Sequence, residues 1–543
     1  MRYNLLAVLA VLLWTACAQV VAPSGGLVDQ KGPLLVSSEP TNKSTQVNPK
    51  HIRIRFNEYI VNKDLGNQLL VSPPLPQAPD ISVKNKTLHL TLPDSLLPNT
   101  TYSLYLGKGI ADLTEGNATE PITYVFSTGA ALDSGWISGT VVNAKDGQPL
   151  KDANIQLYRS GRWTSDSLPY TSNPDFIGRT NAQGQFRIDY LRPGSYRVLA
   201  LADANTDYRI TPPDEALAFL EQPVQLDTNL NDLKLESFLE TPKRLYLKQS
   251  SQTPGRIKLC FNRRVQSFTY KNLRTKKSPE FLHEWTSGVD TLTLWLRDTV
   301  EVDSVCLALE EGGQTFDTLM MKIGRRDEKG KSKGSSVSKL SLSCACNADQ
   351  PALPGDSLWL ISGSPIARID TSRIVWKHRM QGGLLGSTRL HARQYRAALN
   401  LMADSTYSAT FLPGAITDLL GATHDTLVVK CPVMAENKTG NLVLEVEWPK
   451  EGGAGVLERT NPKGQVVERI PFSGSKRFSW KHLLPGTYNF NIIEDRNGNG
   501  RWDTGSFLDR RQPERMIRMV NAPVVRANWD VESVWEPYKP EKK

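Results

Sequence analysis

Apolar and polar residues alternate one by one in several short stretches of the chain. Two of the clearest, His51–Asn57 (HIRIRFN) and Thr87–Leu92 (TLHLTL), have close counterparts at Arg256–Asn262 (RIKLCFN) and Thr291–Leu296 (TLTLWL). A period of two places successive side chains on opposite faces of an extended strand. The pattern therefore predicts half-buried β-strands that belong to one kind of module, used more than once.

Shorter matches indicate a third copy of this module. Thr406–Ser408 and Ile416–Leu419 parallel Thr101–Ser103 and Ile110–Leu113. The spacing gives modules of about 100 residues, which is the size of an Ig-like sandwich.

A second kind of module recurs at a constant offset of 292 residues (478 − 186). Eight residues are identical in register: Phe186, Leu191, Pro193, Gly194, Tyr196, Asp203, Asn205 and Arg209 recur as Phe478, Leu483, Pro485, Gly486, Tyr488, Asp495, Asn497 and Arg501. The Pro-Gly pair predicts a turn, and the alternation after it predicts a strand. We therefore expect one β-module to be used twice.

The amino terminus carries an apolar run, Leu5–Trp14, after the single cation Arg2. The run is about half the ~20 residues needed to cross a bilayer, so it reads as the hydrophobic segment of a signal peptide. With Cys17 after a pair of small residues, the segment resembles a bacterial lipoprotein signal, which implies that Cys17 is the lipidated first residue of the mature chain. An ordinary secretory signal is the alternative, because lipoprotein signals usually carry Leu three residues before the cysteine and this chain has Trp14 there.

Length and composition favour several small β-domains. A chain of 543 residues is too long for one hydrophobic core, and 34 Pro with 39 Gly suit short strands joined by turns. The net charge of +9 comes from 65 basic and 56 acidic residues that are interspersed, so no nucleic-acid-binding patch is expected.

Longer segments carry family resemblances. The segments VSSEPTNKSTQVNPKHIRIRFNEYI, LLPNTTYSLYLGKGIADLTEGN and YVFSTG resemble the bacterial Ig-like domain of S-layer and envelope proteins. The segments ISGTVVNAKDGQPLKDANIQLY and TNAQGQFRIDYLRPGSYRVLAL resemble the carboxypeptidase-regulatory, prealbumin-like β-sandwich. These resemblances imply an all-β chain built as a tandem array of Ig-like and prealbumin-like sandwiches.

The predicted order of segments follows from these matches and from the Gly/Ser/Lys-rich stretch that reads as a flexible joint. It is a lipoprotein signal peptide (1–16), a lipidated spacer (17–32), an Ig-like domain (33–128), a carboxypeptidase-regulatory-like sandwich (134–238), a second Ig-like sandwich (240–324), a flexible linker (325–339), a third Ig-like sandwich (340–432), a second prealbumin-like sandwich (438–535) and a tail (536–543).

Two loops carry oxygen ligands at the spacing of an EF-hand-like calcium site, since Ca²⁺ needs several hard oxygens around a tight turn. The candidate ligands are Asp495, Asn497, Asn499 and Asp503 in one loop, and Asp203, Asn205, Asp207 and Asp214 in its repeat. The first loop lacks an acid at its twelfth position, Ser506, and the second has Tyr208 in place of the glycine. Asx-rich turns that bind nothing are therefore the alternative to Ca²⁺ as a cofactor.

Short Asp-Ser/Thr-apolar triplets occur in four of the predicted modules. They resemble the acceptor motif of a periplasmic O-glycosylation system, although turn-to-strand junctions produce the same triplet. The candidate hydroxyls are those of Ser95, Ser167, Thr291, Thr299, Ser304, Thr318, Ser357, Ser405 and Thr426.

The mature chain has five cysteines, Cys260, Cys306, Cys344, Cys346 and Cys431, so at least one thiol stays outside any intramolecular disulfide. An exported chain permits pairing of Cys260 with Cys306, and of Cys431 with Cys344 or Cys346. Buried free thiols are the alternative.

No motif predicts catalysis. The seven histidines form no H-E-x-x-H arrangement, and no G-x-S-x-G elbow, P-loop or G-x-G-x-x-G is present, so we expect no catalytic residues. Most of the eleven tryptophans of the mature chain are expected in sandwich cores, with Trp163 the best candidate for an exposed ring that stacks on a sugar or a protein partner.

As a whole, the chain resembles bacterial envelope lipoproteins with an amino-terminal Ig-like domain. The resemblance implies a non-enzymatic outer-membrane lipoprotein, acylated with chains such as palmitate at Cys17, whose modules form a scaffold for contacts with envelope proteins. Ala18 after the anchor favours outer-membrane sorting, and the periplasmic face is favoured over the cell surface. The alternative is a surface-exposed adhesin or glycan-binding lipoprotein.

Overall fold

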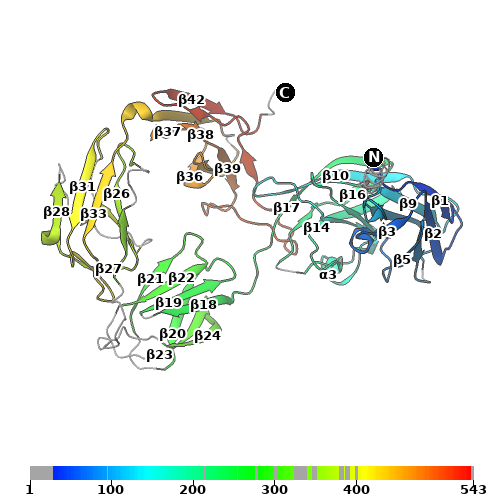
Figure 1. Cartoon of the computed structure of the whole chain (residues 1–543), viewed down its shortest axis with the longest axis horizontal. Helices are drawn as coiled ribbons and strands as arrows, with labels where there is room; N and C mark the ends of the chain where they lie inside the picture. Colours follow the sequence, from blue (N-terminus) through cyan, green and yellow to red (C-terminus); the bar gives the residue numbers. More distant parts are fainter. Residues whose placement is uncertain are drawn as a thin grey trace, which may run out of the picture. The chain divides into compact units, whose positions relative to one another are not determined.

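The computed structural model describes residues 29–94, 96–211, 214–253, 255–274, 279–297, 304–322, 339–344, 351–377, 384–385, 392–397, 401–449 and 451–539. Cys17, Ser95, Thr299 and Cys346 lie outside these ranges. Strands dominate the described chain (Figure 1). The only α-helical turns of the described chain are α2 (Leu65–Gln68) and α3 (Leu168–Thr171). The predicted all-β class is therefore confirmed. Neither of these helical turns, nor any other described helix, has the length and apolarity to cross a bilayer.

The chain divides into two compact units, which are described separately. The first takes in the described residues of Met1–Val142, Gln148–Ile210 and Leu217–Ser237, and the second takes in those of Asn143–Gly147, Thr211–Ala216 and Phe238–Lys543.

The first module of the first unit is a sandwich of a four-stranded and a three-stranded sheet. The larger sheet has the order β1-β2-β6-β5, with β1 (Leu35–Glu39), β2 (His51–Phe56), β6 (Thr87–Thr91) and β5 (Asp80–Lys84). The smaller has the order β4-β7-β9, with β4 (Leu70–Ser72), β7 (Thr101–Gly107) and β9 (Ile122–Ser127). A two-stranded ribbon of β3 (Ile60–Asn62) and β8 (Ile110–Asp112) completes the module.

The alternation along β2 confirms the predicted half-buried strand. Ile52, Ile54 and Phe56 are 0–1% exposed, whereas the residues between them are exposed. The apolar face of β2 packs into a core with Leu88, Leu90 and Tyr124. Burying this many large apolar side chains supplies the main stabilising free energy of the module, at roughly 25 cal/mol per Å².

The second unit contains two further modules with the same strand order. One pairs β18-β19-β22-β21 with β20-β23-β24, and the other pairs β25-β26-β30-β29 with β28-β31-β33, next to a β27-β32 ribbon. The strands of the former are β18 (Leu247–Thr253), β19 (Arg256–Phe261), β20 (Phe268–Asn272), β21 (Phe281–Trp285), β22 (Thr291–Leu296), β23 (Ser304–Glu311) and β24 (Gln314–Lys322). The strands of the latter are β25 (Leu342–Cys344), β26 (Leu358–Ser362), β27 (Ile366–Ile369), β28 (Ile374–Lys377), β29 (Leu384–Leu385), β30 (Gln394–Ala397), β31 (Thr406–Phe411), β32 (Ile416–Asp418) and β33 (Leu427–Pro432).

Hydrogen bonds at equivalent places reinforce this likeness between modules. The Asn57 side chain accepts from the Leu34 backbone N–H at 2.7 Å, and Asn262 accepts from that of Tyr246 at 2.9 Å. Both asparagines directly follow the strand whose alternation is shared. The same local sequence therefore produces the same strand-ending contact twice.

The other kind of module also occurs twice, once in each unit. In the first unit the sheets are β13-β10-β17 and β12-β11-β14-β15, with β16 also pairing with β14. Their bounds are β10 (Gly135–Asn143), β11 (Asn154–Arg159), β12 (Phe176–Arg179), β13 (Gln185–Leu191), β14 (Gly194–Leu201), β15 (Leu217–Phe219), β16 (Val224–Leu226) and β17 (Asn229–Ser237).

The copy in the second unit has sheets β37-β34-β42 and β36-β35-β39-β40, with a β38-β41 pair. The bounds are β34 (Gly440–Val446), β35 (Ala454–Thr460), β36 (Val466–Ser473), β37 (Lys476–Leu483), β38 (Gly486–Thr487), β39 (Phe490–Asp495), β40 (Met516–Arg518), β41 (Val524–Val525) and β42 (Asp530–Trp535). Its last strand, β42, runs parallel to β34.

The two modules of the first unit pack against each other through β4 and β12. The Ser72 hydroxyl, 6% exposed, accepts a hydrogen bond of 3.0 Å from the Ile177 backbone N–H. The Arg179 guanidinium donates to the Asn67 carbonyl at 3.0 Å. These bonds join segments more than a hundred residues apart, so the two sandwiches are docked and not merely tethered.

Candidate functional site

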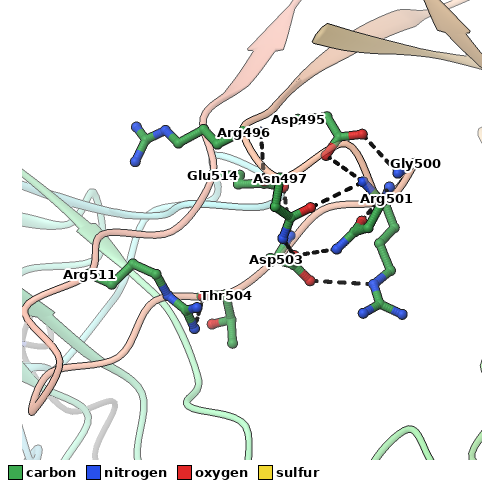
Figure 2. Close-up of polar contacts among 10 residues, drawn as sticks. Asp495, Arg496, Asn497, Gly500, Arg501, Asp503, Thr504, Arg511 and Glu514 are labelled. Carbon is green, nitrogen blue, oxygen red and sulfur yellow. Dashed lines mark hydrogen bonds and ion pairs between the residues drawn. The ribbon is translucent and has the colours of Figure 1, made fainter. Parts of the chain in front are cut away.

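The loop that follows β39 holds the first set of predicted calcium ligands (Figure 2). Asp495 is 4% exposed, and its two carboxylate oxygens accept from the backbone N–H groups of Asn499 at 3.1 Å and of Gly500 at 2.8 Å. Gly498 and Gly500 have φ of +72° and +76°, a left-handed conformation that favours glycine. The Asn-Gly-Asn-Gly run therefore folds the loop back over the Asp495 carboxylate.

Asp503 closes the loop from its other end. One carboxylate oxygen accepts from the side-chain amides of Asn497 and Asn499, both at 2.5 Å, and the other lies 3.4 Å from Arg501 Nε (Figure 2). The amide oxygens accept instead from backbone N–H groups, at 3.1 Å from that of Asn499 and 3.0 Å from that of Arg501. The loop thus brings together three of the four predicted ligands, Asn497, Asn499 and Asp503. The amide nitrogens of the two asparagines face the Asp503 carboxylate.

Glu514 belongs to this loop and was missed by the sequence analysis. It is 5% exposed, and its two oxygens accept from the backbone N–H groups of Arg496 and Asp503, each at 2.9 Å. Burial raises the pKa of Glu514 above its ordinary value, and the nearby Asp503 and Asp495 add to the rise. No spacing rule links Glu514 to the calcium pattern, because only the fold returns the chain to the loop at this residue.

The equivalent loop in the first unit is arranged differently. Asp203 accepts from the Tyr208 N–H at 2.9 Å and from the side-chain amide of Asn154 at 3.0 Å. Asn205 accepts from the Asp207 N–H at 3.0 Å, and Asp207 from the Arg209 N–H at 2.8 Å. Asp214 is exposed. Asn154, on β11, is a further residue that the loop pattern did not indicate.

Among the described residues, no group of three or more His, Cys, Asp or Glu side chains is arranged to hold a metal ion. The loop after β39 is internally hydrogen-bonded, so its conformation is explained by Asx-type turns alone. Calcium binding at either loop stays a prediction.

The candidate glycosylation hydroxyls within the described residues differ in exposure. The exposed residues are Ser167, Thr318 and Thr426, and the half-buried ones are Thr291, Ser304, Ser357 and Ser405. The Ser405 hydroxyl also donates to the Met402 carbonyl. Exposure therefore favours the first three as acceptors.

Cys431 is buried and disulfide-bonded, whereas Cys260 and Cys306 carry free thiols. Of the two alternatives for Cys260 and Cys306, the disulfide is thus wrong, and the residues are half-buried free thiols. The two residues lie on β19 and β23, and these strands belong to different sheets of one sandwich.

Trp163 is not an exposed platform, contrary to expectation. It is half-buried, its ring packs edge-on against Tyr158 at 5.3 Å, and its indole N–H donates to Asp166 at 3.0 Å. The polar composition of its loop was misleading, because the indole folds back onto the sheet. Trp529, 56% exposed, is instead the accessible ring of this type.

A groove lies between the two docked modules of the first unit, and we call it the proline groove. It has a volume of about 390 Å³. One wall comes from the segment after β4, Pro73 to Pro76, and from Pro98. The opposite wall comes from the second module, with Asn173, Pro174 and Asp175. Proline has no backbone N–H, so these prolines add apolar rings to the walls but no backbone donors.

Three arginines border the proline groove: Arg159, Arg162 and Arg192. Arg162 lies 3.3 Å from Asp175, and Arg192 Nε lies 3.1 Å from Asp133. The Arg159 guanidinium sits over the Phe176 ring, 5.4 Å from its centroid. Because guanidinium carries five N–H donors, each ion-paired arginine keeps donors for a ligand.

Residues 29–128 match the family model described as the bacterial Ig-like domain. The predicted Ig-like domain at the start of the chain is thereby confirmed. No curated protein matches the chain.

Several solved structures are similar to the chain at low identity. The S-layer protein rSbsC is 10% identical, with 91% of this chain and 67% of that one covered, at a TM-score of 0.15. BcpA, the major pilin subunit of Bacillus cereus, is 10% identical over 74% of this chain and 99% of that one, also at 0.15. A putative carbohydrate binding protein from Bacteroides uniformis is 9% identical over 35% and 99%, at 0.12. Superpositions with such low scores say nothing about function.

Proposed function

We propose that this chain is a non-enzymatic lipoprotein of the bacterial outer membrane, anchored through Cys17. Its sandwiches serve as a scaffold for contacts between envelope proteins, on the periplasmic face. The Ig-like match at residues 29–128 and the lipoprotein-like segment before Cys17 support this proposal.

The observation that carries the proposal is that the hydrophobic core is divided among small sandwiches. The described residues form five main clusters, within residues 35–126, 137–235, 245–321, 340–429 and 442–535, and these clusters have no described residue in common. A chain built in this way offers many outer sheet faces and edges for contact. Repeated small domains of this kind suit binding distributed over surfaces.

The anchor and the orientation are tested in the native bacterium. We expect radiolabelled palmitate to enter the wild-type protein and the matched control Cys260→Ala, but not Cys17→Ala, which should leave the membrane fraction. Protease added to intact cells should leave the protein whole, and lysis should expose it. Absence of label in the wild type would defeat the anchor, and digestion without lysis would defeat the periplasmic placement.

A surface-exposed, glycan-binding lipoprotein is the second candidate, and Trp529 favours it. The ring is 56% exposed, with the Arg526 guanidinium 5.2 Å from its centroid, so one face remains for stacking. Digestion on intact cells, together with loss of glycan-array binding in Trp529→Ala but not in Trp136→Ala, would support this candidate over the first.

We further propose that the loop Asp495–Asp503 binds calcium weakly, on the order of 10⁻⁴ to 10⁻³ M, as few carboxylates are present. Binding requires the amides of Asn497 and Asn499 to turn their oxygens toward Asp503. Millimolar calcium should raise hydrogen-exchange protection in this loop, and Asp503→Asn should abolish the change while Asp207→Asn retains it. An unchanged wild type would remove calcium from the proposal.

We also propose that the exposed candidate hydroxyls carry glycan. Ser167, Thr318 and Thr426 are the sites where we expect attachment. The intact mass of the native protein should exceed that of the triple alanine variant by more than the three oxygens and two CH2 groups that the substitutions remove. A difference equal to those atoms alone would reject glycan at these positions.

A further inference from the structure

The proline groove combines apolar proline and leucine side chains with the donors of three arginines. The Arg162 and Arg192 side chains are 44% and 40% exposed, and each forms its ion pair through a single guanidinium nitrogen. Asp175 is already engaged, since it accepts from the Arg159 backbone N–H at 2.8 Å and pairs with Arg162. The Arg159 side chain is exposed and forms no ion pair with a described carboxylate. The groove therefore attracts a ligand that carries carboxylates.

Asn173 favours a ligand with hydrogen-bond donors, whereas the arginines favour a ligand with acceptors. Its side-chain oxygen is buried and makes no hydrogen bond within the described residues. A ligand N–H would satisfy this acceptor once the Asn173 side chain turned its oxygen toward the groove. The ligand should thus offer donors as well as carboxylates.

The apolar part of the groove distinguishes between classes of ligand. Its described lining contains Leu75, Leu97 and five prolines but no aromatic ring on which a sugar would stack. Leu97 is 55% exposed. A peptide supplies apolar side chains for such walls, backbone N–H groups for Asn173 and carboxylates for the arginines.

We propose that the proline groove binds an extended acidic peptide segment of an envelope partner. Arg159 and Arg162 contact its carboxylates, and Asn173 accepts a backbone N–H. This inference rests on the proposed scaffold function and names the chemistry of one partner. Because the arginines are exposed, salt should weaken the interaction.

The test uses the full-length chain and a fluorescent peptide of alternating Glu and Leu, with the Lys-Leu peptide as a probe control. We expect the acidic peptide to bind and Arg159→Ala with Arg162→Ala to weaken it, by about tenfold for each arginine. Arg53→Ala is the matched control, since Arg53 is also exposed and ion-paired but lies on β2. Asn173→Leu should weaken binding less, with the salt dependence unchanged.

A variant with reversed charge at the two arginines provides a second test of the site. Arg159→Glu with Arg162→Glu should lose the acidic peptide, gain the Lys-Leu peptide and retain the circular dichroism of the wild type. Equal weakening by Arg53→Ala would show general attraction to a chain of net charge +9 and overturn the site. Binding of polygalacturonate in place of the peptide would overturn the ligand class. Failure of lipidation at Cys17 would leave these binding results intact, so the two proposals fail separately.

Discussion

The Tyr488 hydroxyl donates a hydrogen bond of 2.9 Å to the Leu484 carbonyl, four residues earlier. In the other copy of this module, Tyr196 makes the same bond to the Arg192 carbonyl at 2.8 Å. Both tyrosines are buried, and burial raises the pKa of each above its ordinary value. The relationship explains why Pro-Gly-x-Tyr recurs, since the bond closes the corner that the Pro-Gly turn begins.

Replacing this tyrosine should loosen the corner. We expect Tyr488→Phe to reduce the stability of its module by about 1–2 kcal/mol, because the Leu484 carbonyl loses its buried donor. Hydrogen exchange of the β39 amides measures the effect locally, which avoids treating a multidomain chain as two-state. Tyr59→Phe, at a ring that is 53% exposed, is the matched control and should leave protection unchanged.

The docking of the first two modules depends on Ser72. Ser72→Ala leaves the Ile177 N–H buried without its acceptor, which should destabilise the interface by about 1–3 kcal/mol. We expect faster hydrogen exchange at Ile177 and faster proteolysis between the modules. Ser82→Ala, on the exposed side of β5, should change neither, and an effect of equal size there would contradict the assignment.

Asp112 should make the first module sensitive to acid. Burial alone would raise the pKa of Asp112, but the backbone N–H groups of Glu115, Gly116 and Asn117, at 2.6–2.9 Å, outweigh it and lower the pKa below 3.8. The folded state therefore favours the carboxylate, and its stabilising contribution is present above pH 3.8 and lost as the pH falls through the lowered value.

We expect Asp112→Asn to remove this acid-labile contribution and to destabilise the module at neutral pH. Denaturant unfolding followed across pH 2–6 checks the shape of the curve, with Asp94→Asn as the control at an exposed carboxylate. A wild-type stability that rises on acidification would contradict the sign. Asp418 accepts from the Leu420 and Ala422 N–H groups in an equivalent turn.

The cysteines should differ in reactivity. Without reduction, alkylation under denaturing conditions should modify Cys260 and Cys306 but not Cys431, which requires reduction first. Peptide mapping by mass spectrometry distinguishes the three. Modification of Cys431 before reduction would contradict its disulfide.

Much of the architecture followed from short patterns. The alternation at His51–Phe56 predicts a strand with buried Ile52, Ile54 and Phe56, and these side chains are in the core. The parallel between Ile110–Leu113 and Ile416–Leu419 extends to hydrogen bonds, since Asp112 and Asp418 hold the same kind of turn. Such features depend on residues only a few positions apart in the sequence, so they can be predicted from local spacing.

Contacts between distant segments were not predictable in this way. Glu514 reaches the Asp495–Asp503 loop only because β40 returns beside β39. The polar loop around Trp163 predicts an exposed ring, but the ring packs against Tyr158.

The sequence by itself determined the class of fold and the two kinds of repeated module, because a period of two residues and a Pro-Gly turn act locally. Tertiary structure alone decided how Ser72 meets Ile177, and hence that a groove with three arginines forms between two sandwiches. The physical reason is that a sheet face buries its apolar side chains whatever it packs against, whereas the partner of a given face depends on the path of the whole chain.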